Sequence, residues 1–259
     1  MLDASVATGI AASRRPEDRC TTAYTRNPAQ RATPVDAAAG CPGWQIGTVT
    51  APDDWRAWRP KPDEPLAAFD HANASFLTPY LAIGGDLDIT EHDVALGQLE
   101  ELGDAGITHV IDARIEASNE EWIRERNANV EYLHLGIDDA GQRVPDAWFD
   151  EGVAFARQAI ESGGVVLAHC HMGINRGPSM GFAILLALGW DAREALDAIH
   201  VARPIAFVAY AEDALRWHHA QDADGLAVDL QRLHEWRQDN DLDLDRVLRA
   251  TWVENAPFA

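Results

Sequence analysis

Residues 165–179, VVLAHCHMGINRGPS, constrain the fold of this chain more than any other stretch. The stretch opens with short apolar and β-branched residues behind two glycines, a pattern typical of a buried strand. It closes with Pro178 and an apolar run, 180–188, that is long enough for a buried helix. Pro is favoured in the first turn of a helix because its missing N–H would have no partner there. Residues 170–176 are therefore predicted to form a turn between a strand and the N-terminus of a helix.

Such a turn predicts an anion-binding site. Backbone N–H groups without partners converge at a helix N-terminus, and the helix dipole adds positive potential there. The same field stabilises a thiolate, so we expect Cys170 to be ionised near neutral pH. Arg176 can hold two phosphate oxygens with its planar guanidinium. Together they predict a nucleophile directed at a bound phosphoryl group.

The pattern His169-Cys170, five residues and then Arg176, with Gly173 midway, resembles the signature of cysteine-based protein tyrosine phosphatases, especially the dual-specificity branch. The similarity extends over about residues 74–219. The alternative interpretation is a buried structural cysteine with an unrelated arginine. A sulfur-transfer enzyme of the rhodanese type also uses a cysteine on an anion-binding loop, but the spacing of Gly173 and Arg176 disfavours it.

The resemblance implies a general acid on the loop after the strand at 130–137. In the family an Asp lies there about thirty residues before the nucleophile, where it protonates the leaving oxygen. Asp139 matches that position, and Asp138 is the second candidate. Without the cysteine loop downstream, two adjacent Asp residues would be interpreted as a solvated turn.

The implied reaction has two steps and needs neither a cofactor nor a metal. The Cys170 thiolate attacks phosphorus while Asp139 protonates the leaving group, and water then hydrolyses the phosphocysteine. Arg176 and the loop N–H groups hold the equatorial oxygens. His169 is expected to orient the loop rather than act as a base. The remaining residues expected to line the phosphate site are His171, Met172, Gly173, Ile174, Asn175 and Gly177.

Gly177 departs from the family pattern, in which Ser or Thr follows the arginine and stabilises the leaving thiolate in the second step. Ser179 is the nearest hydroxyl along the chain that could substitute for it in part. The departure predicts slow phosphocysteine hydrolysis. It also supports the alternative function, a catalytically weak, pseudophosphatase-like module that binds phosphorylated partners.

The expected substrates are phosphorylated proteins or small phosphate monoesters. The loop lacks the paired Lys residues of phosphoinositide phosphatases in this superfamily, and no segment resembles the phosphotyrosine-recognition element of the larger tyrosine-specific enzymes. Both absences favour a shallow pocket for phosphotyrosine and leave phosphoserine and phosphothreonine open.

The predicted fold is α/β, with a central, mainly parallel sheet flanked by helices, like that of the protein tyrosine phosphatases, and extra C-terminal helices. We expect strands at 76–85, 107–112 and 130–137, and a helix after Thr90 with a capping signal from Thr90 and Asp93. A further helix begins after Asp191 and ends before Pro204. The predicted organisation is a partly disordered N-terminal extension (1–65), a catalytic domain (66–220) and a helical extension packed on it (221–259).

Composition limits the partners. The formal net charge is -21 at pH 7, which disfavours nucleic acid and anionic membrane surfaces because both attract basic faces. The chain has 3 cysteines, an odd number that suits a reducing compartment, so a cytoplasmic location is expected. No apolar run is long enough to span a membrane. The oligomeric state stays open.

Overall fold

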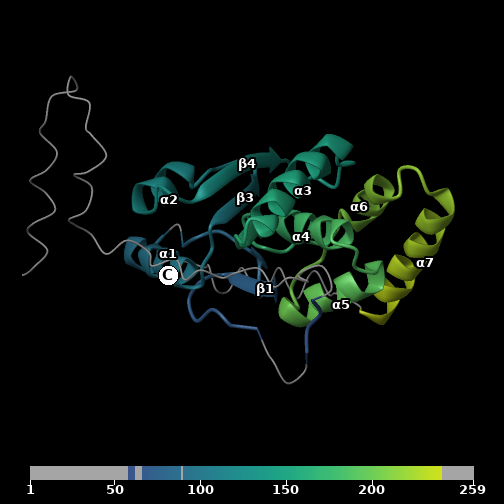
Figure 1. Cartoon of the computed structure of the whole chain (residues 1–259), viewed down its shortest axis with the longest axis horizontal. Coiled ribbons are helices and arrows are strands. Elements are labelled where there is room, and N and C mark those ends of the chain that lie inside the picture. Colours follow the sequence, from purple (N-terminus) through teal and green to yellow (C-terminus); the bar gives the residue numbers. More distant parts are fainter. Residues whose placement is uncertain (1–57, 62–65, 89, 241–259) are drawn as a thin grey trace, which may run out of the picture. The chain divides into compact units, whose positions relative to one another are not determined.

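The computed structural model describes residues 58–61, 66–88 and 90–240, and these residues are built around a five-stranded mixed sheet (Figure 1). Its order is β1-β2-β5-β3-β4, with β1 and β2 antiparallel and the other neighbours parallel, which confirms the mainly parallel sheet. Most of the predicted extension 1–65, and residues 241–259, lie outside the described residues. The strands are β1 (Ala74–Thr78), β2 (Leu81–Gly84), β3 (His109–Arg114), β4 (Glu131–Ile137) and β5 (Val166–His169).

Helices cover both faces of the sheet and divide its core in two. On one face α3 to α6 pack together with α7, and on the other face α1 and α2 cover a smaller apolar cluster. Helix α4, which follows the cysteine loop, is buried over nearly its whole length because it packs between the sheet and its neighbouring helices. The helices are α1 (His92–Asp104), α2 (Glu120–Arg126), α3 (Asp146–Glu161), α4 (Arg176–Ala187), α5 (Ala192–Ala202), α6 (Ala211–His218) and α7 (Ala223–Asp239).

The single strand predicted at 76–85 is wrong, because this stretch belongs to a hairpin. β1 and β2 pair with Phe76 opposite Ala82, and the turn lies at Pro79 and Tyr80. Pro79 has no N–H for a ladder, which ends the first strand. Tyr80 is buried, so the apolar pattern runs through the turn without a polar break.

Two predicted helix starts have different outcomes. Asp191 caps α5 as predicted, since its carboxylate accepts the N–H groups of Arg193 and Glu194. The capping signal from Thr90 and Asp93 is wrong. Helix α1 begins at His92, and the carboxylate of Asp88 accepts the N–H groups of Thr90 and Glu91 instead. A short polar side chain one turn earlier therefore organises this helix start.

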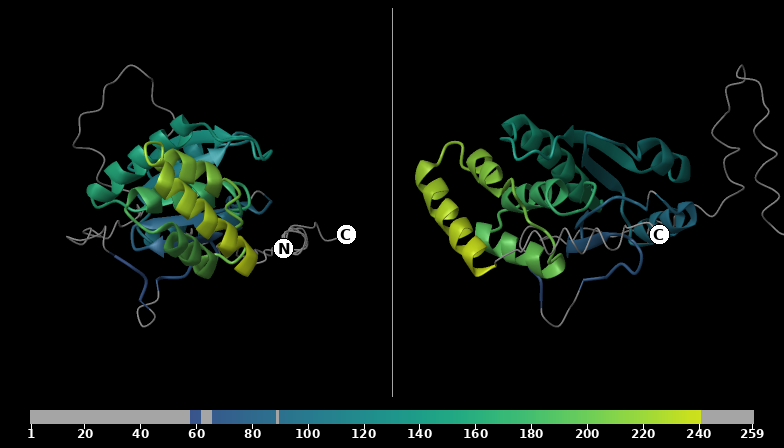
Figure 2. Two further views of the ribbon diagram at one scale, coloured as in Figure 1. Left: turned by 90° about the vertical axis from the view of Figure 1, so that its right-hand side faces the viewer. Right: turned by 180° about the vertical axis from the view of Figure 1, so that it is seen from behind.

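The C-terminal helix α7 lies side by side with α5 and α6 (Figure 2). Trp236 is buried there and donates from its indole N–H to Asp197 of α5 over 2.8 Å. The expected extra helices after the sheet are thus present. Within the described residues, no helix has the length and apolar character needed to cross a membrane.

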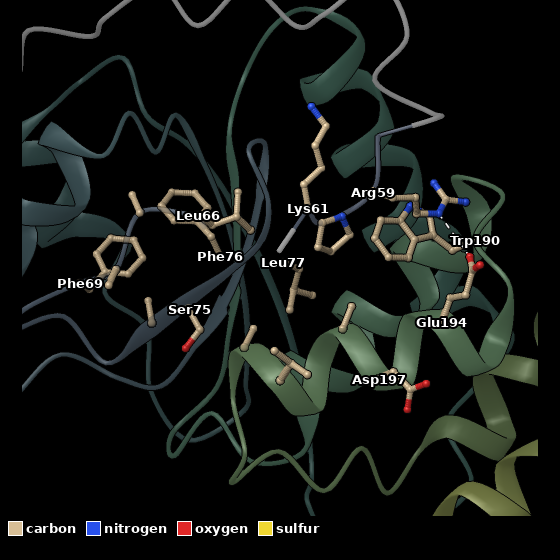
Figure 3. A pocket seen from close by; sticks show the side chains of 17 residues that line it. Arg59, Lys61, Leu66, Phe69, Ser75, Phe76, Leu77, Trp190, Glu194 and Asp197 are labelled. Atoms are coloured by element: carbon tan, nitrogen blue, oxygen red, sulfur yellow. Dashed lines mark hydrogen bonds and ion pairs between the residues drawn. The ribbon is translucent and has the colours of Figure 1, made fainter. Parts of the chain in front are cut away.

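A cavity of about 870 Å³ lies between the segment before β1, β1 itself and α5. Figure 3 shows Phe69, Phe76 and Trp190 around it, with Glu194 and Asp197 on the helix side. The guanidinium of Arg59 stacks over the Trp190 ring at 4.2 Å. None of its lining residues belongs to the cysteine loop, so this cavity is separate from the site described next.

Candidate active site

The cysteine loop lies at the carboxyl end of β5, in the middle of the sheet. Cys170 is 2% exposed, and its N–H donates to the carbonyl of Gly84 at the end of β2 over 3.1 Å. Helix α4 begins at Arg176, so the strand, turn and helix predicted from the sequence are present. Gly173 has φ 65°, and a Cβ there would lie 2.6 Å from the backbone of Gly84. The turn therefore requires glycine.

Arg203, at the end of α5, supports this loop from behind. Its Nε donates to the carbonyl of Gly173 over 2.6 Å, and its Nη2 donates to that of Met172 over 3.0 Å. In trans peptides the next N–H points opposite to each carbonyl, so these bonds turn two loop N–H groups away from Arg203. Burial lowers the pKa of Arg203 to about 10, with the Cys170 charge opposing the shift, so the guanidinium stays charged at neutral pH.

Arg176 is held by Glu116, in the loop after β3. Nη1 and Nη2 each donate to a Glu116 carboxylate oxygen over 2.7 Å, and Nη1 also donates to the carbonyl of Ile137 over 3.1 Å. The Arg176 bonds lower the pKa of Glu116 to about 2. Burial opposes the charge on Arg176, but the Glu116 bonds and the Cys170 charge raise its pKa above the ordinary value. Nε is buried without a hydrogen-bond partner, so this donor is available to a phosphate.

Asp139, after β4, is a second carboxylate that contacts the cysteine loop. Its Oδ2 lies 3.5 Å from Nε of Arg176, and its Oδ1 accepts from Nδ2 of Asn175 over 2.5 Å. Asp138 contributes its backbone carbonyl instead, which accepts from Gln142 and from the hydroxyl of Tyr210. Of the two sequence candidates for the general acid, Asp139 is the one that the fold brings to Arg176.

The chain was compared with known protein families. Residues 92–210 match the model of the dual specificity phosphatase catalytic domain. The match spans slightly less than half of the chain, so these residues are similar to that catalytic domain. Mouse dual specificity protein phosphatase 15 is 30% identical over 131 residues, which are 49% of this chain and 49% of that protein. Mouse dual specificity protein phosphatase 2 is 27% identical over 128 residues, which are 47% and 38% of the two chains. The chain thus spans about half or less of these relatives.

Solved structures give similar matches. The crystal structure of DUSP15 is 22% identical, with a TM-score of 0.48, and the match covers 61% of this chain and 96% of that one. The structure of human DUSP28 is 20% identical, with the same TM-score of 0.48, and covers 58% and 96%.

Next to the cysteine loop lies a buried network centred on Asp112. Its carboxylate accepts from Nε and Nη2 of Arg114 over 2.8 and 2.7 Å, and from the hydroxyl of Tyr132 over 2.5 Å. Burial favours the neutral acid, yet these bonds and the nearby imidazole of His169 hold the pKa of Asp112 below its usual value. Asp86 completes the network through Nη1 of Arg114.

His169 faces this network rather than the solvent. Its Nε2 lies 3.7 Å from Oδ1 of Asp112, and burial lowers the pKa of the imidazole although Asp112 opposes the shift. A buried, neutral imidazole behind Cys170 has no access to a substrate proton. The orienting role of His169 stays a prediction.

The residues expected to line the phosphate site differ in exposure. The side chain of His171 is 52% exposed, with Nδ1 3.8 Å from Asp86, and Met172 is partly exposed. The others are buried, and Asn175 is engaged with Asp139. Only His171 and Met172 therefore offer side chains at the surface of the loop, while Gly173, Ile174, Asn175 and Gly177 contribute backbone or internal contacts.

Gly177 is packed tightly against the end of β5. A Cβ at this position would lie 2.9 Å from the carbonyl oxygen of Ala168 and 3.0 Å from the backbone of His169. The helix therefore starts too close to the strand for a side chain. Ser179 has other partners than the cysteine, since its hydroxyl donates to Oδ1 of Asn175 over 3.2 Å and accepts the N–H of Tyr210 over 3.3 Å.

Sequence reasoning missed Glu116, Arg203 and Tyr210, which contact the predicted site residues. One signal was available for Glu116: it follows a parallel strand, and ligand-binding residues gather at the carboxyl ends of such strands. Arg203 directly precedes Pro204 at a helix end, which marks the helix boundary but not the contact with the loop. No local pattern distinguishes Tyr210 from a core tyrosine.

Proposed function

We propose that this protein hydrolyses phosphate monoesters through a phosphocysteine intermediate, with phosphotyrosine in proteins as the first candidate substrate and phosphoserine and phosphothreonine as further ones. One observation carries the proposal: Nε of Arg176, in the cysteine loop, is a buried donor without a hydrogen-bond partner and lies 3.5 Å from the Asp139 carboxylate. A bound phosphoryl group would supply the missing acceptor.

In the first step the Cys170 thiolate attacks phosphorus and the bond from phosphorus to the leaving oxygen breaks. The proton of Asp139 goes to that oxygen, so a neutral alcohol or phenol departs. Arg176 and the loop N–H groups neutralise the charge on the three equatorial oxygens. Glu116 fixes the plane of the Arg176 guanidinium through two 2.7 Å bonds, which orients it before substrate binds.

In the second step a water molecule attacks phosphorus and the bond from sulfur to phosphorus breaks. Asp139, now ionised, takes a proton from the water, inorganic phosphate forms and the Cys170 thiolate is restored. No hydroxyl follows Arg176 to assist the leaving thiolate, because Gly177 occupies that position. The second step is therefore expected to limit turnover.

The test is hydrolysis of a generic aryl phosphate across pH 5 to 8 by the wild type, Cys170→Ser, Asp139→Asn and Asp138→Asn. We expect Cys170→Ser to abolish phosphate release, a loss of about 10³-fold or more. Asp139→Asn is expected to remove the basic limb of the pH profile, while the neighbouring Asp138→Asn keeps it. Activity in all variants would contradict the proposal. Phosphotyrosine, phosphoserine and phosphothreonine peptides then rank the substrates.

Gly177 favours a second candidate, a module that binds phosphorylated partners without turning them over. This second function predicts that the wild type binds a phosphopeptide tightly and releases no phosphate at any pH. A burst of one product equivalent per protein followed by slow release would instead identify an enzyme limited by its second step.

A further inference from the structure

We infer that Asn175 is a positioning residue for the general acid, because it holds Oδ1 of Asp139 and leaves Oδ2, the oxygen beside Arg176, to carry the transferred proton. The inference rests on the proposed function and deepens it. Asn175 lies directly before Arg176 in the cysteine loop and is 9% exposed. Its amide binds the carboxylate of Asp139, while the neighbouring Arg176 contacts the same segment through the carbonyl of Ile137.

The contacts of Asn175 determine the orientation of its amide. Its Oδ1 accepts the backbone N–H of Ala209 over 2.7 Å and the hydroxyl of Ser179 over 3.2 Å. A backbone N–H can only donate, so the amide oxygen must face Ala209. The amide nitrogen therefore faces Asp139 and donates to its Oδ1 over 2.5 Å.

A second donor reaches the same oxygen of Asp139. The one O–H of Tyr210 lies within reach of Oδ1 at 3.1 Å and of the Asp138 carbonyl at 3.3 Å, and Oδ1 is the nearer of the two. Burial and the charge of Asp139 raise the pKa of Tyr210 to about 12, so this hydroxyl keeps its proton throughout the range of an assay. Two donors on Oδ1 make it the carbonyl-type oxygen of the protonated acid. The proton is then on Oδ2, the oxygen that lies 3.5 Å from Nε of Arg176.

The contacts around Asn175 connect the segment of Asp139 with the loop of Cys170. Ser179 belongs to α4, Ala209 and Tyr210 directly precede α6, and Asn175 belongs to the loop that begins at Cys170. These elements pack against each other in the core. A shift of the Asp139 segment relative to Cys170 would break these bonds, so Asn175 sets the distance between acid and nucleophile.

The experiment compares substrates with poor and good leaving groups. Phenyl phosphate needs a proton on its leaving oxygen, whereas a fluorinated umbelliferyl phosphate releases a stable anion without one. We expect Asn175→Ala to lower kcat/KM for phenyl phosphate about 10- to 100-fold and to change the activated substrate by less than about 3-fold. Asn175→Asp keeps the shape and the acceptor but loses the donor, and it should show the same selectivity. Asn129→Ala, an exposed asparagine before β4, is the matched control and should match the wild type.

A double variant separates positioning from general damage. In an Asp139→Asn background, Asn175→Ala should cause no further loss on phenyl phosphate, because the group it positions is already inactive. Equal losses on both substrates, or an undiminished loss in that background, would overturn the inference while leaving the proposed function intact. A wild type inactive on both substrates would overturn the proposed function and the inference together.

Discussion

Arg114 and Arg176 both lie against carboxylates at the carboxyl end of the sheet, but they use their donors differently. Arg114 is 1% exposed, and its Nε, Nη1 and Nη2 all donate to Asp112 or Asp86. Arg176 gives Nη1 and Nη2 to Glu116, while its buried Nε has no hydrogen-bond partner. In both cases carboxylates raise the pKa of the guanidinium although burial opposes it.

We interpret the Arg114 cluster as a structural ion pair and, under the proposed function, the Arg176 cluster as an anion-binding one. A buried guanidinium in which each of the three nitrogens donates to a carboxylate is stable only as a unit, because removing one partner leaves the others uncompensated. A buried charge with one donor left over is preorganised for an anion that arrives later. Two similar arginines about 60 positions apart therefore predict losses of different kinds.

The largest expected effect is on the structural side. Arg114→Met would leave the buried carboxylates of Asp112 and Asp86 without their cation, so the free energy of unfolding should fall by about 3–5 kcal/mol. Arg176→Met should cost clearly less stability, because the side chain of Glu116 is 46% exposed and can be hydrated instead. Urea denaturation of both variants measures the contrast. Equal losses of stability would break the comparison.

The next effect is on the binding side. Arg176→Lys replaces a planar fork by a single ammonium, which can neither keep both Glu116 bonds nor present Nε to phosphate. The expected loss is about 10²- to 10³-fold in kcat for an aryl phosphate, with the stability changed by less than about 1 kcal/mol. Steady-state kinetics and thermal unfolding of the same sample give both values. A kcat close to that of the wild type would refute the role of Nε.

Gly177→Ser tests how tightly the loop is packed against the sheet. The sequence suggests that a hydroxyl here would speed phosphocysteine hydrolysis, but its Cβ would lie 2.9 Å from the backbone oxygen of Ala168. We expect the free energy of unfolding to fall by about 1–3 kcal/mol and the slow phase after the burst to gain little. Faster hydrolysis with unchanged stability would show that the loop accommodates a side chain there.

The smallest effect concerns the clamp on Arg176. Glu116→Gln removes the charge of the partner while keeping its shape, and we expect kcat/KM to fall about tenfold. A carboxyl whose folded pKa is lowered contributes above its ordinary pKa and loses that contribution as the pH falls toward the folded value, here from about 4.5 to about 2. The ratio of wild-type to Glu116→Gln activity should therefore stay constant from pH 5 to 8. An activity ratio that changes between pH 5 and 8 would mean that Glu116 titrates within that range, contrary to this prediction.

The backbone conformation around Cys170 could be predicted from consecutive residues alone. The strand, the glycine at φ 65° and the helix beginning at Arg176 all follow from residues 165–188, because backbone geometry over one turn depends on neighbours in the chain. Asp139 was predicted through the resemblance to the phosphatase family, in which an Asp follows the corresponding strand. The mainly parallel sheet followed from the same alternation of strands and helices.

Only the tertiary structure decided which side chains complete the site. Glu116 lies 60 positions from Arg176, and Tyr210 lies 71 positions from Asp139. These contacts form only because β3, α4 and the start of α6 pack together. No local sequence pattern indicates contacts between residues so far apart in the chain. The hairpin at β1 and β2 was missed for a related reason, since the buried Tyr80 continues the apolar pattern across the turn. Residues near in sequence set the shape of the cysteine loop, whereas packing between distant elements decides which charges surround it.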